Sequence, residues 1–294
     1  MQTQGRSPMS PSARALLGAL AVVAATSVGF AVGDALATPD RSSATIAGSS
    51  ARGAMDYDWT WRLAPGRTIE IEGVNGTIRA RGSAGGAVVV HAHKHARHSD
   101  PDRVTIEVLE HAGGVTLCVR YPDVPGSRPN RCEPGGHSHM STRDNDVNVD
   151  FEVQVPAGVH LAAHTVNGGV EALGLDADAE AHTVNGSVTL ETRGHAEAST
   201  VNGSLRARLG TMGAAGALDF RTVNGSITLE LPDDAGAVVS ASTVNGGIDS
   251  DFPITVSHVA FMGRRLHGTI GHGGPGLELS TVNGSIRLRR VSSL

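Results

Sequence analysis

The feature that most constrains this chain is a four-residue motif, Thr-Val-Asn-Gly, which occurs six times in the second half of the sequence. A related Val-Asn-Gly-Thr stands earlier, at 74–77. The asparagines of these motifs are Asn75, Asn167, Asn185, Asn202, Asn224, Asn245 and Asn283. From Asn167 onward they are 18, 17, 22, 21 and 38 residues apart. Repeats this short cannot each bury a core of their own, so they must stack on one another.

The last spacing is about twice the others and predicts a degenerate repeat between the last two motifs. The segment 265–271, Arg-Leu-His-Gly-Thr-Ile-Gly, fits that position, with His267 in place of the asparagine. The chain would then contain about seven repeats of about twenty residues.

Aligned on the motif, the repeats alternate polar and apolar residues as strands do. The residue two before each threonine is apolar, and the residue directly before it is polar. This alternation predicts that the threonines face inward and that the valines after them face outward as a stripe. The predicted stripe consists of Val166, Val184, Val201, Val223, Val244 and Val282.

Each Asn-Gly pair predicts a turn, because this pair suits backbone that needs a positive φ. The glycines concerned are Gly168, Gly186, Gly203, Gly225, Gly246 and Gly284. Such a turn can be the tip of an antiparallel hairpin or the corner of a solenoid with parallel stacking. Identical residues in identical columns favour the solenoid, where threonines and asparagines form hydrogen-bonded ladders. We therefore predict an all-β protein with a β-solenoid over 158–294, preceded by a smaller N-terminal β region over 57–157.

The amino terminus has the composition of an export signal. Arg6 and Arg14 precede an apolar run that ends in Ala35-Leu36-Ala37, a typical cleavage site. We expect residues 1–37 to be a signal peptide; an uncleaved membrane anchor is the alternative. Residues 38–56 are small and polar and predict a flexible linker. The mature protein would be periplasmic, at the cell surface or extracellular.

The N-terminal β region contains a Pro- and Gly-rich loop at 121–148, bordered by the two cysteines of the chain, Cys118 and Cys132. In an exported chain, a disulfide between them is the plain expectation. It would stabilise the fold by about 3 kcal/mol in the chain-entropy model.

The signal segment, the strand Phe-Glu-Val-Gln-Val-Pro-Ala-Gly-Val at 151–159, and the repeated Thr-x-Asn-Gly-x-(Ile/Val/Leu) resemble the bacterial "putative adhesin" family of exported β-strand-repeat proteins of unknown function. The resemblance covers about residues 66–290. It implies a β-helix-like stack and an adhesin-like role, and it assigns no chemistry. The uniform Val-Asn choice and the many histidines are departures from the family pattern.

The histidines are the strongest candidates for chemistry. His91, His93 and His95 alternate along one predicted strand, so they share a face, and His137 and His139 repeat the spacing in the loop. Imidazoles placed in this way can bind Zn²⁺ or Cu²⁺. The alternative is a solvated polar face, since no carboxylate or cysteine adjoins the first group in sequence.

Composition favours a binding protein over an enzyme or a nucleic-acid binder. The net charge is −5, without the basic stripe of a nucleic-acid binder. Catalytic motifs are absent from the sequence, and only 3% of residues are aromatic, which argues against sugar stacking. We expect a non-enzymatic protein without a required cofactor that binds another protein or an envelope component. A periplasmic metal-binding module and a carbohydrate-active β-helix enzyme are the alternatives.

Overall fold

A computed structural model describes residues 47–51, 54–211, 217–254 and 263–291. They belong to one compact unit, Pro39–Leu294. The predicted signal peptide lies outside the described residues. Within the described ranges the protein is all-β, with one 3-10 turn, η2 (Pro101–Arg103), and none of these ranges contains a helix with the length and hydropathy needed to span a membrane.

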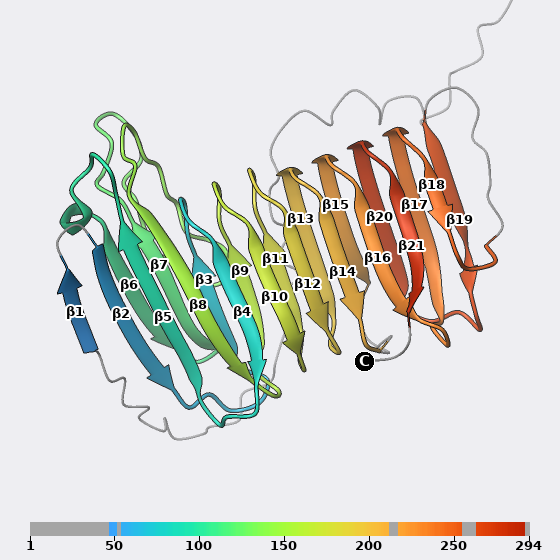
Figure 1. The fold of residues 1–294 in the computed structure, drawn as a ribbon, viewed down its shortest axis with the longest axis horizontal. Coiled ribbons are helices and arrows are strands. Elements are labelled where there is room, and N and C mark those ends of the chain that lie inside the picture. Colours follow the sequence, from blue (N-terminus) through green and yellow to red (C-terminus); the bar gives the residue numbers. More distant parts are fainter. Residues whose placement is uncertain (1–46, 52–53, 212–216, 255–262, 292–294) are drawn as a thin grey trace, which may run out of the picture. The chain divides into compact units, whose positions relative to one another are not determined.

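The strands form two large sheets (Figure 1). Sheet A contains, in spatial order, β1 (Ala47–Ala51), β2 (Ala54–Trp61), β5 (Val88–His95), β8 (Asn148–Pro156), β4 (Ile78–Ser83), β10 (Val170–Leu175), β12 (Val188–Thr192), β14 (Leu205–Leu209), β16 (Ile227–Pro232), β21 (Ile286–Val291) and β18 (Ile248–Ser250). Sheet B contains, in the reverse direction along the chain, β19 (Arg264–Ile270), β17 (Ala237–Asn245), β20 (Gly276–Asn283), β15 (Leu218–Asn224), β13 (Ala196–Asn202), β11 (Ala179–His182), β9 (His160–His164), β3 (Thr68–Glu72), β7 (Gly114–Arg120) and β6 (Thr105–His111).

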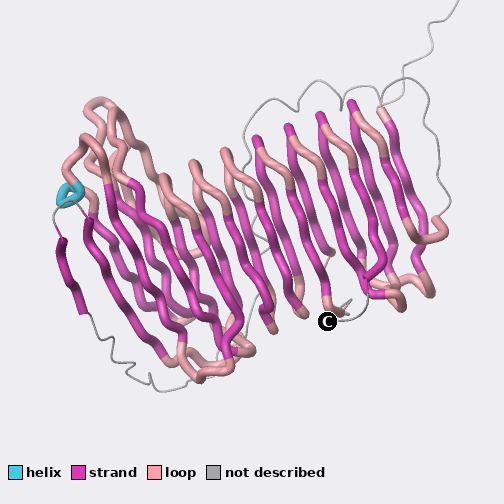
Figure 2. Tube along the Cα trace, in the orientation of Figure 1, coloured by secondary structure: helices cyan, strands magenta, loops and turns pink. Residues whose placement is uncertain are grey.

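Each Asn-Gly turn connects a strand of sheet B to a strand of sheet A, and each strand pairs with its equivalent in the next repeat. β9, β11, β13 and β15 pair in parallel, as do β10, β12, β14 and β16. The register is that of the sequence columns: Val170 lies opposite Val188, and Val188 opposite Leu205. Because the strands on the two sides of a turn belong to different sheets, the turns are not hairpin tips. Figure 2 shows the turns aligned along the margins of the strands.

The order of the last repeats differs from the sequence prediction. β20 pairs with β15 on one side and with β17 on the other, and β21 lies between β16 and β18 in the same way (Figure 1). The C-terminal repeat is therefore inserted between two repeats that precede it in sequence. The prediction of a degenerate repeat at 265–271 is wrong. That segment is β19, which pairs antiparallel with β17 and places His267 opposite Ser240. Periodicity alone does not distinguish a skipped repeat from an inserted one.

Two ladders of side-chain hydrogen bonds join the repeats at the turns. Each asparagine after Asn75 donates from Nδ2 to the Oδ1 of the preceding one at 2.8–2.9 Å, in the spatial order Asn75, Asn167, Asn185, Asn202, Asn224, Asn283, Asn245. The threonines are buried, and each Oγ1 donates to a glycine carbonyl of the neighbouring repeat at 2.8–3.1 Å. The asparagine ladder is thus as predicted, whereas the threonines bond to backbone and not to one another.

The glycine of the motif is required for space and not for a positive φ. Only Gly76 among the motif glycines has φ in the left-handed range. At each of the others, a Cβ would overlap the carbonyl oxygen of the glycine in the neighbouring repeat. The predicted reason for Asn-Gly is therefore wrong: the pair permits close stacking of backbones, as glycine does where chains approach closely.

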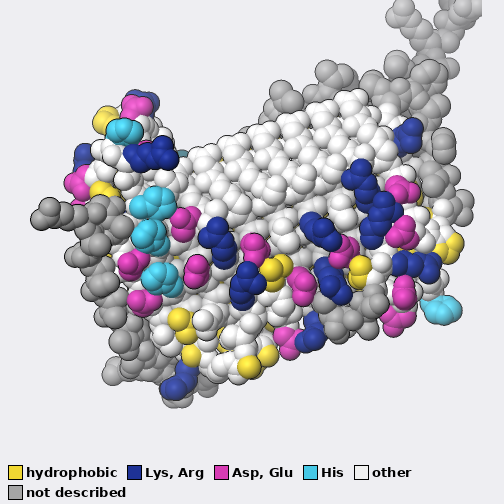
Figure 3. Space-filling view, in the orientation of Figure 1, with side chains coloured by type: hydrophobic (Ala, Val, Ile, Leu, Met, Phe, Trp, Pro, Cys, Tyr) yellow, Lys and Arg dark blue, Asp and Glu magenta, His cyan; other side chains and the backbone are white. Residues whose placement is uncertain are grey.

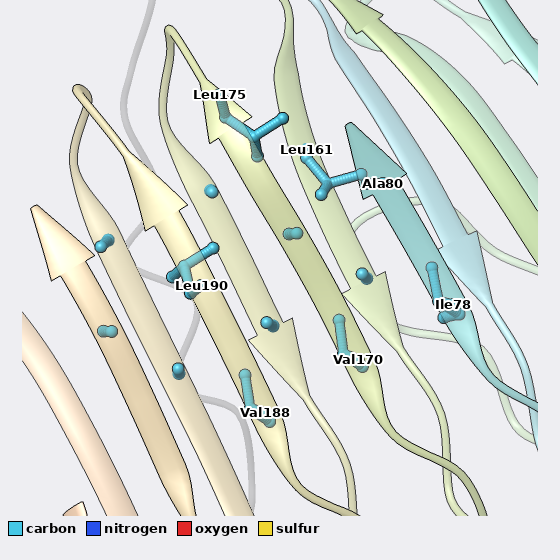
Figure 4. Close-up of a cluster of buried hydrophobic side chains, with 14 of the residues drawn as sticks. Ile78, Ala80, Leu161, Val170, Leu175, Val188 and Leu190 are labelled. Atoms are coloured by element: carbon cyan, nitrogen blue, oxygen red, sulfur yellow. The ribbon is translucent and has the colours of Figure 1, made fainter. Parts of the chain in front are cut away.

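The apolar columns of both sheets form one core. Figure 4 shows part of it: Ile78, Val170 and Val188 follow one another from strand to strand. Further along, Phe220 lies between Ala198 and Leu279 and is fully buried. This column therefore combines small side chains in its first repeats with large ones further along, within one close-packed core.

The N-terminal strands continue the same sheets. β3 pairs in parallel with β9, and β4 with β10, so the turn at Asn75 is in register with the others. The boundary expected between residues 157 and 158 does not coincide with a break in either sheet. Antiparallel pairs extend both sheets beyond this repeat: β1–β2–β5–β8 in sheet A and β6–β7 in sheet B. Part of the predicted linker is strand, since β1 and the start of β2 fall within 38–56.

Candidate functional site

The first candidate surface is the row formed by the Val-Asn-Gly turns and the residue after each glycine, which we call the turn row. Its asparagines are exposed except Asn75, which is half-buried. The following serines add a second ladder, in which the backbone N–H of one repeat donates to the Ser Oγ of its neighbour at 3.2–3.4 Å. In Figure 3 the turn row is a band without charged side chains or histidines, above the charged rows of sheet A. It offers amide, hydroxyl and methyl groups at the regular spacing of paired strands.

The valines of the predicted stripe lie in this row. Five are 36–50% exposed: Val166, Val184, Val223, Val244 and Val282. Val201 is half-buried. The stripe is narrow, since polar turn residues flank it on both sides.

The second candidate surface is the outward face of β5 and of the strands beside it, which we call the histidine face. His91, His93 and His95 alternate along β5 and so share this face, and Figure 3 shows histidine side chains gathered beside acidic ones on one side of the molecule. β2 and β8 flank β5, and they place Asp56 and Asp150 directly opposite His93.

Carboxylates orient the imidazoles. His93 Nδ1 lies 2.6 Å from Asp56 Oδ1, and His91 Nδ1 lies 2.8 Å from Asp58 Oδ1. The hydrogen bond from His93 is the main cause that lowers the pKa of the Asp56 carboxyl below its usual value. The rings of His93 and His95 lie 5.3 Å apart, centroid to centroid.

Sequence reasoning missed these aspartates because they are distant in sequence. Asp56 fell in the predicted linker, and Asp150 follows the long loop. The sequence does contain one relevant pattern, the alternation Asp-Tyr-Asp-Trp at 56–59, which matches the alternation of the histidines. This pattern does not indicate which strands pair with each other.

The structure places His137 and His139 elsewhere. They lie in the 121–147 loop, where His139 exchanges backbone hydrogen bonds of 2.8 and 2.9 Å with Arg131. This loop packs on sheet B, through Gly135 and Gly136, which donate to Glu70 at 2.9 and 2.7 Å. The two histidine groups are therefore on different sheets. Cys118 and Cys132 form a disulfide that ties the loop to β7, with their Cα atoms 5.8 Å apart.

A buried acidic pair lies under that loop. Glu70 and Glu72 are 4% and 7% exposed, and Thr116 Oγ1 donates to Glu70 at 2.6 Å. Burial raises the pKa of Glu72 to about 7; a hydrogen bond with Ser138 opposes this, and the neighbouring Glu70 adds to it. Burial and Glu70 therefore favour the protonated form of Glu72, whereas Ser138 of the loop favours the ionised form.

An open cleft of about 640 Å³ lies where the turn row meets the histidine face. Its lining includes His95 and Asp150 from sheet A and Asn167 and Gly168 from the turn row. The loop that follows β5 forms one wall. Asp146 accepts hydrogen bonds there from the backbone of residues 97–99, of which the strongest, from Ser99, holds the pKa of its carboxyl well below the usual range.

Comparison with known proteins gives weak likenesses in structure only. The sequence matches no protein-family model and no curated protein. A solved structure from Clostridium sporogenes, described as a "putative cell adhesion protein", aligns over 85% of this chain and 100% of its own, with 11% identity and a TM-score of 0.43. A "putative adhesin" from Bacteroides fragilis aligns over 82% and 98%, with 12% identity and a TM-score of 0.36.

Proposed function

We propose that this chain is an exported β-solenoid protein that works by binding, as an adhesin or scaffold at the cell envelope, and not by catalysis. The solenoid is supported by the parallel, in-register pairing of the repeats in both sheets and by the continuous asparagine ladder. Export is supported by the signal-like composition of residues 1–37.

The observation that carries the binding role is the turn row. It includes a long band of turn residues without charged side chains (Figure 3), and exposed valines precede its exposed asparagines in the sequence. Exposed apolar side chains aligned in a row, with polar groups on either side, are typical of contact surfaces. Its partner is another protein or an envelope component that presents a flat, uncharged surface.

The test is a triple substitution in adjacent repeats, Val184→Thr, Val201→Thr and Val223→Thr. Threonine keeps the β-branched shape and removes one methyl group per site, so the fold should be unchanged. The matched control is Val238→Thr, at a valine that is 41% exposed and lies outside the turn row. Binding to envelopes isolated from the producing organism should fall for the triple variant and not for the control.

Equal binding by the triple variant and the native protein would discard the turn row as the contact surface. Export is tested separately, by mass spectrometry of the protein recovered outside the cytoplasm. The proposal requires an amino terminus near Thr38, and an intact residue 1 contradicts cleavage.

A further inference from the structure

One polar atom on the histidine face has no hydrogen-bond partner. Nδ1 of His95 is buried and unpaired, although the histidine side chain is 42% exposed as a whole. The nearest carboxylate oxygen is Oδ2 of Asp150, at 3.8 Å. That distance is too long for a hydrogen bond. A buried nitrogen without a partner has lost its hydration and has no hydrogen bond to replace it. A ligand between His95 Nδ1 and Asp150 Oδ2 would therefore stabilise this nitrogen.

We propose that this gap is a binding site for Zn²⁺ or Cu²⁺, with His95 Nδ1, Asp150 Oδ2 and His93 Nε2 as the protein ligands. Two ligands at about 2.0–2.2 Å from a tetrahedral Zn²⁺ are about 3.3–3.6 Å from each other. The separation of 3.8 Å is therefore a few tenths of an ångström wider than the bound geometry. Small side-chain rotations close that difference.

The third ligand comes from the same strand. His93 is two residues before His95 and lies opposite Asp150 in the sheet. Its Nδ1 is held by Asp56 at 2.6 Å, so Nε2 is the nitrogen left for a metal. A carboxylate on the far nitrogen of a histidine is the usual second partner of a metal ligand, because it fixes the ring and makes the ligating nitrogen more basic.

Asp150 is oriented in the same way. Its Oδ1 accepts from the backbone N–H and from Oγ1 of Thr77, both at 2.7 Å, which leaves Oδ2 directed to His95. Asp150 Oδ1 and His93 Nδ1 are therefore both hydrogen-bonded to the protein, which leaves Asp150 Oδ2 and His93 Nε2 as the candidate ligand atoms. Three protein ligands leave a coordination position for water, on the side of the cleft that His95 and Asp150 line.

His91 does not belong to this set. Its Nδ1 faces Asp58 at 2.8 Å and its Nε2 faces Asp56 at 3.7 Å, so both nitrogens already face carboxylates. In the described part of the chain, no three potential ligands converge on one point in their present rotamers. Binding therefore requires the His93 ring, whose side chain is 43% exposed, to pivot about its hydrogen bond to Asp56 so that Nε2 moves toward His95.

The test is isothermal titration of the full chain, produced without a histidine tag, with zinc chloride and with copper chloride. His95→Gln and His93→Gln should each weaken binding by at least about tenfold. Two controls are matched to them. His91→Gln removes a histidine from the same strand and face. His160→Gln removes the histidine of another His–Asp pair, in which His160 Nδ1 lies 3.8 Å from Asp178 Oδ2. The proposed site does not include this pair. Both should bind within about twofold of the native protein.

Circular dichroism of each variant separates lost binding from lost folding. Electron paramagnetic resonance of the copper complex should show two coordinated nitrogens in the native protein. It should show one coordinated nitrogen in His93→Gln and one in His95→Gln. The proposal is overturned if His91→Gln weakens binding as much as His95→Gln does. It is equally overturned if the native protein binds no more tightly than a His93→Gln/His95→Gln double variant.

Discussion

Substitution of Gly203 by alanine tests whether close stacking explains the glycine of the motif. Gly203 lies in an interior repeat, between the turns of Asn185 and Asn224. A Cβ at this position would overlap the carbonyl oxygen of Gly186. That carbonyl would have to withdraw by about 1 Å to reach the shortest separation that Cβ atoms tolerate.

The magnitude follows from the bonds that such a shift breaks. Gly203 N–H donates to Asn224 O at 3.1 Å, and Gly186 N–H donates to Asn202 O at 3.1 Å. A displacement of about 1 Å takes two or three bonds of this kind beyond hydrogen-bonding distance, at about 1 kcal/mol each. The lost bonds in Gly203→Ala should lower the free energy of unfolding by about 3 kcal/mol. Alanine also restricts the unfolded chain, which offsets about 0.4–1 kcal/mol of this loss.

The matched control is Gly247→Ala, at the second glycine of the turn that follows Asn245. The nearest atom to a Cβ there is Ser285 Oγ, at 3.9 Å, so the added methyl group makes an ordinary van der Waals contact without overlap. Both variants share the effect on the unfolded chain, and the control should be neutral or slightly more stable than the native protein. Urea unfolding followed by circular dichroism gives both free energies. A difference of less than about 0.5 kcal/mol between the two variants refutes the steric explanation.

Three further predictions concern stability. Folding raises the pKa of Glu72 from 4.5 to about 7, so the stability that protonated Glu72 contributes is complete below pH 4.5 and is lost as the pH rises through 7, by up to about 3 kcal/mol. In urea unfolding between about pH 5 and pH 8, the native protein should therefore lose more stability than Glu72→Gln does. Equal losses would contradict the raised pKa of Glu72. Thr200→Val removes the 2.8 Å bond to Gly186 O and should cost about 1 kcal/mol in the same assay, whereas no change would show that this bond adds nothing. Replacing Cys118 and Cys132 with serine should cost about 3 kcal/mol and speed amide exchange in the 121–147 loop, and unchanged exchange would mean that the disulfide does not hold the loop.

The repeat motif predicted much of the fold because it specifies both register and stacking. The columns that contain Val170 and Val188 were readable from alternation alone, and these residues lie opposite each other. The strands of the N-terminal region were readable too, from the apolar alternation in 88–95 and 148–156. Such patterns report which face of a strand is buried, and that is a local property.

Pairing between distant strands was not readable. Nothing in the local pattern says that the repeat around Asn283 lies between those of Asn224 and Asn245, because all three carry the same motif and each fits against either of the others. The same limit hid the carboxylates of the histidine face. Asp56 and Asp150 meet His93 only because β2 and β8 flank β5. The steric reason for the glycines was hidden as well, since it depends on the backbone of the neighbouring repeat.

Paired cysteines test whether the repeats stack in parallel with the C-terminal repeat inserted between two earlier ones. Ser226, Ser285 and Gly247 occupy the same place in three successive turns of the stack. Neighbouring strands are about 4.8 Å apart, within the range that a disulfide spans, whereas strands two apart are about 9.6 Å from each other and beyond it. Under mild oxidation, peptide mapping should find the crosslink in Ser226→Cys/Ser285→Cys and not in Ser226→Cys/Gly247→Cys. A crosslink in the second pair and none in the first would contradict the account.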